Sequence, residues 1–578
     1  MEKEFTLSNG KAIVNFSKKY CDSKRKLINS EGFKRVITSF VENELKVDEV
    51  VIYDKFMEFC SSEDELIESF IETFKLLTLF SVEEIKNSSN RYYKFVEDVE
   101  LFAELVELLF SYWTRIERYT IVHSSQSGEG LQNVRFTSAN DKFNDLLLAT
   151  KRRILNSITK TEEHVYRQST AGGMAGVTLN EVSWDCPEEY KHVYSVPFIN
   201  TVLIQPPFLA YTKRNTRSGL FEEKYENPLL NINMVEGDWF IYPAKVGKML
   251  TFVYFHKDFM VHGINLANLF QLAKESEYEN KKPELIYVFG YPDGNSQKDT
   301  YYYKDQKNDI MIGYANYCDD VDYFGYMKKM LLTLHNIKQI DNGRLPIHGA
   351  MVNIVLKNGK QSNIIIMGDS GAGKSESLEA FRTLNQKYIR HMRTIFDDMG
   401  YLQKEADGSI KAYGTEIGAF VRVDDLDPAY AYQQLDKGVY INMDKVNARV
   451  TIPIASYDLI TRGFPVDFFL YANNYDDTGD KKIVICNKVE DAIRVCEDGA
   501  RRAKGTTSEV GLVKSYFANP FGPVQEKSAT EVLVRDYFKI MYDSGVKLGE
   551  IHTNLAVPGK AHEGPRLAAE ELFTLVNK

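Results

Sequence analysis

Cysteine is scarce in this sequence, and long apolar runs are absent from it. The six cysteines are scattered, with no CxxC pair and no Cys/His spacing typical of zinc sites. We therefore expect reduced thiols rather than a disulfide framework. No stretch approaches the roughly 20 apolar residues that span a bilayer, and the opening MEKEFTLSNGK lacks the apolar core of a secretory signal. These absences predict a cytoplasmic protein that does not enter a membrane.

Positive charge is also in deficit. The 578 residues include 71 Lys and Arg against 81 Asp and Glu, which gives a formal net charge of −10. Such a balance provides no general attraction to nucleic acid or to anionic membrane surfaces. We expect no nucleic-acid partner, and a phosphate-bearing ligand must be bound by a local basic site. The rest of the composition, 44% hydrophobic and 26% charged, is typical of soluble globular proteins.

The chain is too long for one ordinary core and predicts two or three domains. In residues 1–125 apolar residues recur at helical spacing among acidic ones, which predicts a helical N-terminal domain. Its charged faces are read as solvated surfaces, although they could also bind a protein partner. Residues 126–340 begin with a polar loop and continue with short β-rich runs. Residues 341–578 alternate strands and helices, so the predicted fold class is α/β.

A glycine-rich loop stands out in the third domain. The stretch NIIIMGDSGAGKSES is an apolar run followed by G-x-x-x-x-G-K-[ST], with a strand expected before the loop and a helix after it. In such a loop the backbone N–H groups cradle phosphate oxygens, the lysine reaches the terminal phosphates and the hydroxyl can bind Mg²⁺. The residues expected to bind the nucleotide here are Gly368, Asp369, Ser370, Gly371, Ala372, Gly373, Lys374, Ser375 and Glu376.

A pair of aspartates follows the loop at the end of another predicted strand. In RTIFDDMGYL, Asp397 and Asp398 come directly after an apolar run. Alone they would more often be a solvated turn or a helix cap. Beside a phosphate loop they are candidate ligands of a divalent metal ion, because phosphoryl transfer needs acidic metal ligands on a neighbouring strand.

The order of further segments resembles a known family. These segments are DYFGYMKKM, RLPIHGAM, the phosphate loop, GTEIGAF, NARVTIPIASYD, FPVDFFLYANN, KGTTSEVG and ATEVLVRDYF. Across residues 285–560 they resemble the phosphoenolpyruvate carboxykinase superfamily. The resemblance implies carboxykinase-like mixed sheets with a P-loop nucleotide-binding core, to which this chain adds a helical N-terminal domain. It also implies that Lys329, His348 and Asp398 bind an active-site Mn²⁺, for which the lysine must be neutral.

Other positions take their roles from the same resemblance. The carboxylate substrate would be bound by Arg217, in NTRSGLFEEKY, while Lys374 and Ser375 would bind phosphates and Mg²⁺. Glu416 matches the family's FEGG segment. The expected sets are Lys374, Lys329, Asp398 and Arg217 for catalysis; the loop residues and Arg449 for the nucleotide; and Lys329, His348, Ser375, Asp397 and Asp398 for metal.

Three departures from the family pattern concern substrate recognition. Tyr326 replaces the glutamate of the family's GEMKK segment. The loop residues Asp369 and Glu376 resemble those of HPr protein kinases, which share the same core fold. Where the ATP-using family has an arginine that assists phosphoryl transfer, only Asn487 and Lys488 can be aligned, and a lysine lacks the planar fork of a guanidinium.

The resemblance therefore supports more than one function. The first is a carboxykinase that converts oxaloacetate and a nucleotide, with ATP the expected donor ahead of GTP and pyrophosphate, into phosphoenolpyruvate and CO₂. The second is an HPr-kinase-like enzyme that phosphorylates a protein serine or a small metabolite. The third is a nucleotide-binding sensor without catalysis.

Overall fold

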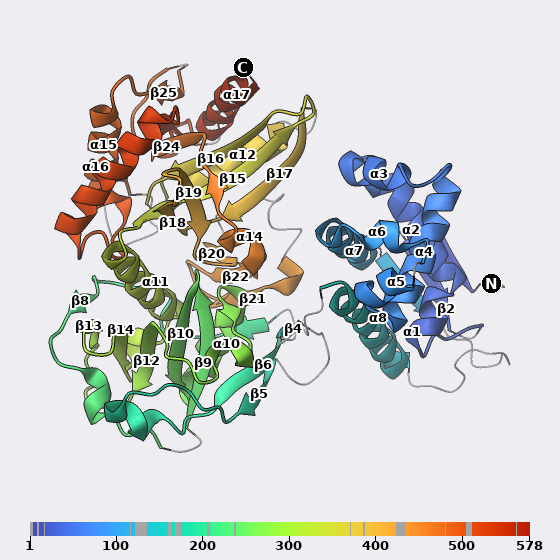
Figure 1. Cartoon of the computed structure of the whole chain (residues 1–578), viewed down its shortest axis with the longest axis horizontal. Coiled ribbons are helices and arrows are strands. Elements are labelled where there is room, and N and C mark those ends of the chain that lie inside the picture. Colours follow the sequence, from blue (N-terminus) through green and yellow to red (C-terminus); the bar gives the residue numbers. More distant parts are fainter. Residues whose placement is uncertain are drawn as a thin grey trace. The chain divides into compact units, whose positions relative to one another are not determined.

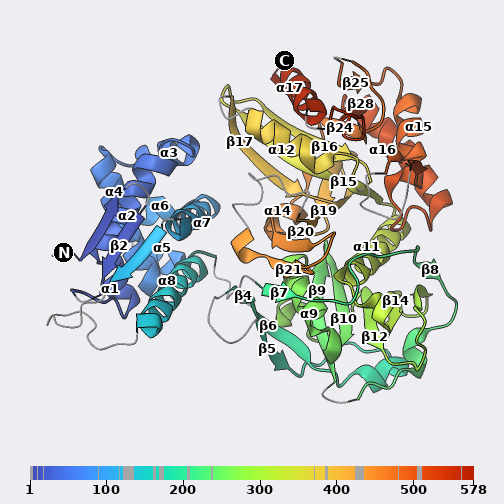
Figure 2. The ribbon, with the colours of Figure 1, turned by 180° about the vertical axis from the view of Figure 1, so that it is seen from behind.

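The computed structural model divides into two compact units, Met1–His164 and Val165–Lys578, which we describe separately (Figure 1 and Figure 2). The residues that it describes are 4–8, 11–16, 18–88, 90–115, 117–121, 136–159, 165–167, 175–204, 208–235, 238–369, 371–384, 388–423, 435–479, 481–503, 511–561 and 563–577.

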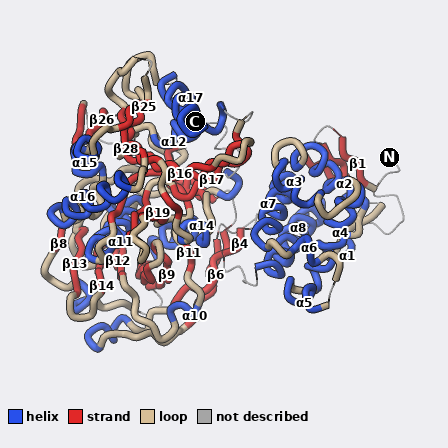
Figure 3. The backbone as a smooth tube through the Cα atoms, turned by 45° about the horizontal axis from the view of Figure 1, so that its top comes forward, coloured by secondary structure: helices blue, strands red, loops and turns tan. Residues whose placement is uncertain are grey.

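Unit 1 is mainly helical, as predicted for the N-terminal region (Figure 3). Serines begin four of its helices, and each side chain accepts a hydrogen bond from the first turn, which satisfies a backbone donor that the helix leaves unpaired. The helices are α1 (Lys24–Ile28), α2 (Glu31–Phe40), α3 (Val50–Met57), α4 (Glu63–Leu79), α5 (Val82–Asn87), α6 (Tyr93–Val96), α7 (Val99–Arg115) and α8 (Phe136–Thr159). Strands β1 (Phe5–Ser8), β2 (Lys11–Asn15) and β3 (Glu117–Ile121) form a small sheet in that order.

The last helix of unit 1 lies beyond the predicted boundary at residue 125. Helix α8 packs against α4 and α7. Lys151 forms an ion pair of 2.7 Å with Glu107, and Arg153 Nε donates to the Thr78 carbonyl at 2.9 Å. The polar segment predicted as a loop falls partly outside the described residues, and from Phe136 onward it is part of α8. The compact N-terminal unit therefore runs to His164.

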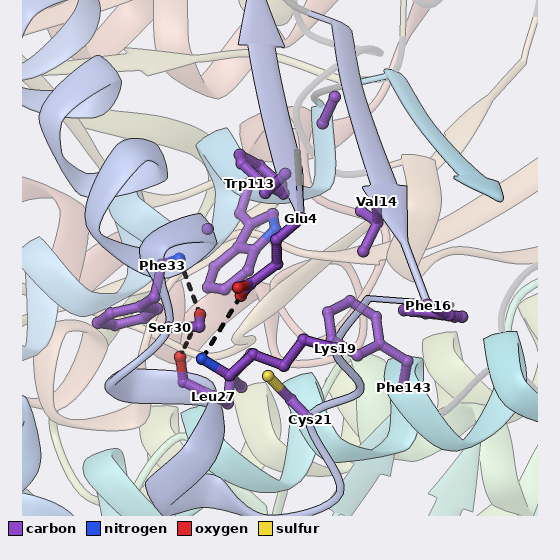
Figure 4. A pocket seen from close by; sticks show the side chains of 13 residues that line it. Glu4, Val14, Phe16, Lys19, Cys21, Leu27, Ser30, Phe33, Trp113 and Phe143 are labelled. Atoms are coloured by element: carbon purple, nitrogen blue, oxygen red, sulfur yellow. Dashed lines mark hydrogen bonds and ion pairs between the residues drawn. The ribbon is translucent and has the colours of Figure 1, made fainter. Parts of the chain in front are cut away.

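Unit 1 also holds a small apolar pocket between its sheet and its helices (Figure 4). Aromatic side chains, among them Phe33 and Trp113, line much of it. Its polar lining residues are Glu4, Lys19 and Ser30, and Lys19 Nζ lies 3.7 Å from Glu4 Oε1.

Unit 2 begins with a ten-stranded mixed sheet. Its central strand, MLTFVYFH, is buried at every position, which explains why the run is continuously apolar rather than alternating. The order is β4-β6-β9-β10-β12-β14-β13-β8, with β5 on β6 and β11 on β9. The strands are β4 (Val165–Arg167), β5 (Ala175–Asn180), β6 (Phe198–Ile204), β8 (Glu222–Glu223), β9 (Trp239–Val246), β10 (Met249–His256), β11 (Gln271–Leu272), β12 (Leu285–Tyr291), β13 (Thr300–Asp305) and β14 (Ile310–Asn316). The short helices α9 (Met260–Asn265) and α10 (Glu275–Tyr278) lie between them in sequence.

A second, nine-stranded sheet follows. Its order is β23-β19-β18-β15-β16-β24-β28-β25, with β17 on β15. The strands are β15 (Leu345–Leu356), β16 (Gln361–Met367), β17 (Ile389–Phe396), β18 (Met399–Lys404), β19 (Ile410–Gly414), β23 (Phe464–Pro465), β24 (Phe468–Asn473), β25 (Ile483–Ile485) and β28 (Lys547–His552). Alternate side chains of β15 and β16 pack on α12 (Lys374–Leu384) and α17 (Glu563–Asn577), and the others pack on α15 (Val489–Asp498) and α16 (Lys527–Asp543). Helices therefore cover both faces, as Figure 1 shows.

Helix α11 (Phe324–Asp341) joins the two large sheets. It is buried along most of its length and contacts β12 and β14 of the first sheet and β15 and β18 of the second. A four-stranded sheet, in the order β20-β22-β21-β7, and the hairpin β26-β27 complete the unit. Their strands are β7 (Phe208–Ala210), β20 (Gly418–Arg422), β21 (Val439–Ile441), β22 (Arg449–Pro453), β26 (Ala500–Arg502) and β27 (Leu512–Lys514), and helix α14 (Tyr457–Thr461) follows β22. The fold is thus mixed α/β with several mixed sheets, preceded by a helical region.

The described helices include none whose length and apolar character would let it cross a bilayer.

Candidate functional site

The glycine-rich loop connects β16 to α12. The strand ends at Met367 and the helix begins at Lys374. Gly373 has φ of +96°, and a Cβ there would lie 2.6 Å from Thr553 Oγ1, so backbone conformation and space both require glycine. The buried Lys374 Nζ donates to the Gly368 carbonyl at 2.6 Å, across the mouth of the loop. Ser370 lies outside the described residues, as does the side chain of Ser375.

Residues that follow the neighbouring strands hold this loop in place. Strands β16, β24 and β28 are parallel, so their carboxyl ends meet at one edge of the sheet. After β24, Asn474 Nδ2 donates to the Gly371 carbonyl at 3.0 Å. After β28, Thr553 Oγ1 donates to the Ala372 carbonyl at 2.9 Å. The loop carbonyls are thereby paired with side chains, which keeps the loop backbone in one conformation.

Asp398 is the centre of the adjacent polar cluster. It lies in the turn between β17 and β18 with φ of +87°, a strained conformation of the kind that concentrates at functional sites. Its carboxylate lies 2.8 Å from three side-chain nitrogens: Oδ2 accepts from Lys328 Nζ and from Lys329 Nζ, and Oδ1 faces His348 Nε2. His348 is on β15 and both lysines are on α11, so three elements meet at one carboxylate.

These neighbours shift the pKa values of the cluster in opposite directions. Burial alone would raise the pKa of Asp398, but Lys328, Lys329 and His348 outweigh it and hold that pKa well below its usual range. Burial lowers the pKa of Lys329, and the charge of Lys328 lowers it further. Burial and Lys374 lower the pKa of His348. The cluster therefore favours an ionised carboxylate beside a neutral imidazole and an amine shifted toward its neutral form.

The hydrogen bond of the other imidazole nitrogen, Nδ1, determines the tautomer of His348 and therefore whether Nε2 faces Asp398 with a proton or with a lone pair. Nδ1 lies 2.9 Å from the Ala518 carbonyl, which can only accept, so Nδ1 carries a proton. In the neutral imidazole, Nε2 then directs its lone pair toward the carboxylate. Two acceptors that face each other in this way suit a shared cation.

Three side chains around Asp398 could together hold a divalent metal ion. Imidazole nitrogen, carboxylate oxygen and a lysine amine of lowered pKa converge at Asp398. Within the described ranges, no three His, Cys, Asp or Glu side chains form a group that could hold a metal ion, so a site here would need the Lys329 amine as a ligand beside His348 and Asp398. Where such an ion binds, these three residues would hold it.

A second carboxylate lies behind Lys328. Glu416 is completely buried, and its Oε1 lies 3.0 Å from Lys328 Nζ. Burial raises the pKa of Glu416 to about 7, with Lys328 opposing the rise and Asp398 adding to it. The same two carboxylates outweigh burial at Lys328 and raise its pKa. Lys328 therefore stays protonated between Asp398 and Glu416.

The other predicted aspartates lie beside the loop. Asp397 is buried, which raises its pKa; the charge of Asp398 adds to the rise and Lys374 opposes it. Asp369, the second residue of the loop, accepts from Arg501 Nε at 2.8 Å, and its Oδ1 lies 3.5 Å from His348 Nδ1. Asp369 thus connects the glycine-rich loop with the His348 cluster.

Arg217 reaches the same cluster through the ring of Phe521. Its guanidinium lies 5.3 Å from the ring centroid, and Lys329 Nζ lies 4.6 Å from it. His348 packs edge-on against that ring at 6.2 Å. Arg217 also lies over Phe221 and donates to the Gly219 carbonyl. A loop residue from far upstream is thereby placed beside the Asp398 cluster.

Tyr326 and Lys488, two residues that differ from the carboxykinase pattern, have different surroundings. The Tyr326 hydroxyl accepts from Ser218 N at 3.3 Å and from Lys298 Nζ at 3.4 Å, next to Arg217 in the chain. Lys488, aligned with the family's arginine, is an exposed residue at the start of α15.

Within the described residues, Arg449 forms no hydrogen bond or ion pair with the loop or with Asp398. It begins β22, and its guanidinium lies 5.6 Å from the ring of Phe420. The buried Nε has no hydrogen-bond partner in the part of the chain that the structure describes. Its connection to the site is indirect, through Tyr323, whose pKa burial raises and the charge of Arg449 lowers.

No family model and no curated protein matches this chain. The resemblance to the carboxykinase superfamily therefore rests on the quoted sequence segments alone.

Some residues of the site could not be selected from the sequence. Phe521 gives no signal, because an aromatic after NP looks like any core residue. Asn474 and Thr553 follow strands that are neighbours only after folding. Arg501 is one of two adjacent arginines, and nothing in the pattern says which one is buried beside the loop.

Proposed function

We propose that unit 2 is a nucleotide-dependent enzyme of the phosphoenolpyruvate carboxykinase type, which decarboxylates and phosphorylates oxaloacetate. The observation that carries the proposal is that Lys329 Nζ and His348 Nε2 each lie 2.8 Å from the Asp398 carboxylate, and that His348 is on β15, the strand paired with β16, which leads into the glycine-rich loop. These are the three residues for which the carboxykinase resemblance implies an Mn²⁺ site.

Each residue has a distinct part in this proposal. The loop amides and Lys374 bind the triphosphate, and the lysine leaves the Gly368 carbonyl to do so. Arg217 binds a carboxylate of the acceptor, since its guanidinium is held between Phe221 and Phe521 and forms no ion pair with an acidic side chain of the described residues. Bound at Asp398, Mn²⁺ would supply Lewis-acid polarisation of the oxaloacetate carbonyl. Lys328 holds Asp398 ionised and oriented from behind.

A kinase for a hydroxyl acceptor is the second candidate, and one observation favours it. Asp397 is a buried carboxyl of raised pKa within the electrostatic reach of Lys374. A carboxylate with a pKa shifted toward neutrality is suited to accept the proton of a serine or metabolite hydroxyl during phosphoryl transfer. The HPr-kinase-like loop residues Asp369 and Glu376 agree with this alternative.

The test is the formation of phosphoenolpyruvate from oxaloacetate with Mn²⁺ and, in parallel, ATP, GTP or pyrophosphate. Lys374→Met is the blank, because it keeps the buried stem and removes the charge. Product with one donor, absent in the variant, is the expected result and names the donor. If the protein binds ATP and Mn²⁺ but forms no phosphoenolpyruvate, the carboxykinase proposal fails, and transfer to serine-containing proteins or to hydroxylated metabolites is measured next.

A further inference from the structure

Arg501 is placed beside the phosphate loop by a short hairpin. It is the central residue of β26, which pairs antiparallel with β27, and its side chain is 3% exposed. The next residue, Arg502, is exposed because successive side chains of a strand point to opposite faces. Two adjacent arginines thus have opposite environments.

Hydrogen bonds fix β26 to the loop itself. Asn474 Oδ1 accepts from Arg502 N at 2.9 Å, and Asn474 Nδ2 donates both to the Arg502 carbonyl, at 2.9 Å, and to the Gly371 carbonyl, at 3.0 Å. On the other side of Arg501, the Tyr471 hydroxyl donates to the Ala500 carbonyl at 2.8 Å. The backbone on both sides of Arg501 is therefore anchored, and one of the anchors is shared with the phosphate loop.

The partner of Arg501 is an unusual residue for a phosphate site. Arg501 Nε donates at 2.8 Å to Oδ2 of Asp369, the residue directly after Gly368. An ionised carboxylate in a loop that binds polyphosphate repels the ligand unless a cation compensates it. The charges of Asp369 and Lys374 cancel, and Glu376 gives residues 368–376 a net charge of −1. Arg501 is the cation that offsets this charge.

We propose that Arg501 is a second cationic group for the polyphosphate bound at residues 368–375, and that Asp369 is its positioning residue. This inference rests on the proposed phosphoryl transfer. In that step the acceptor oxygen forms a bond to the γ-phosphorus, the bond from that phosphorus to the β,γ-bridging oxygen breaks, and its electron pair leaves with the nucleoside diphosphate. The Arg501 guanidinium donates hydrogen bonds to the phosphate oxygens, a role for which the aligned but exposed Lys488 is poorly placed.

The test compares Arg501→Met, Asp369→Asn and the double variant with Arg502→Met as the matched control. Calorimetric titration with ATP and with adenosine measures binding, and thermal unfolding checks each fold. We expect Arg501→Met to weaken ATP binding by about 10- to 100-fold, from the usual strength of charge-assisted hydrogen bonds, and to leave adenosine binding unchanged. Arg502→Met should match the wild type. Arg501→Lys should recover part of the affinity, because it restores the charge without the fork.

The double variant separates ligand binding from simple neutralisation of Asp369. If Arg501 only compensates that carboxylate, removing both charges restores wild-type ATP affinity, and the proposal is overturned. Equal ATP affinities for Arg501→Met and Arg502→Met would also overturn it. A persistent loss in the double variant supports it. Because ATP binding is the readout, this outcome is independent of whether the enzyme forms phosphoenolpyruvate.

Discussion

Glu416→Gln should remove a pH-dependent loss of stability from unit 2. The pKa of this buried carboxyl is raised from 4.5 to about 7 in the folded protein. Between these values the folded state keeps a proton that the unfolded state has lost, so the stability of the wild type falls as pH rises through this window. A shift of this size corresponds to roughly 3 kcal/mol, at about 1.4 kcal/mol per pKa unit. Glutamine cannot titrate, so the variant lacks this decline.

The assay is urea unfolding at pH values from 4.5 to 8, followed by tryptophan fluorescence. The chain has three tryptophans, and in a Trp113→Phe background the remaining two, Trp184 and Trp239, report on unit 2 alone. The variant also loses the ion pair with Lys328, which changes its free energy of unfolding by an amount that we take as independent of pH. The informative quantity is therefore how the free energy of unfolding of the variant, minus that of the wild type, changes with pH. We expect that difference to move in the variant's favour by about 3 kcal/mol from pH 4.5 to pH 8. Parallel curves would refute the raised pKa.

Three further perturbations test the loop and the cluster. Lys374→Met should weaken ATP binding at least tenfold, since it removes charge-assisted hydrogen bonds, and an unchanged calorimetric titration would contradict the assignment of the loop. His348→Gln should weaken Mn²⁺ binding by about 10- to 100-fold, measured by electron paramagnetic resonance, while ATP affinity stays within about twofold; equal Mn²⁺ affinities would remove His348 from the ligand set. Gly373→Ala should lower the free energy of unfolding by about 2–4 kcal/mol, because left-handed strain adds to the contact with Thr553. Gly359→Ala, also at positive φ but with open space around it, is the control and should lose only about 1–2 kcal/mol.

Local pattern was sufficient for much of the secondary structure. The apolar run before GDSGAGKS is β16, the helix begins at the loop lysine, and helical spacing in the acidic N-terminal region corresponds to the helices of unit 1. Helix α8 was missed because its first part, FTSANDKFND, is rich in residues typical of loops. Its place is decided by packing on α4 and α7, which no local window contains.

The site depends more strongly on topology. Residues 329, 348 and 398 meet because β15 pairs with β18 through His348 and Met399 while α11 packs on both strands. Neither pairing follows from spacing along the chain. The family resemblance grouped Lys329, His348 and Asp398 without geometry, whereas Arg501 and Phe521 had no motif and could be found only in three dimensions.

The two adjacent lysines show how one helix can supply two different functional groups. Both Nζ atoms lie 2.8 Å from Asp398 Oδ2, yet the Lys328 side chain is fully buried and that of Lys329 is 18% exposed. Lys328 has a second carboxylate, Glu416, and its pKa is raised. Burial lowers the pKa of Lys329, and the charge of Lys328 lowers it further. A permanent ammonium at 328 therefore favours the neutral amine at 329, which is the form that can bind a metal ion. The ammonium of Lys328 therefore adds to the effect of burial on Lys329, and the carboxylates of Asp398 and Glu416 keep Lys328 charged.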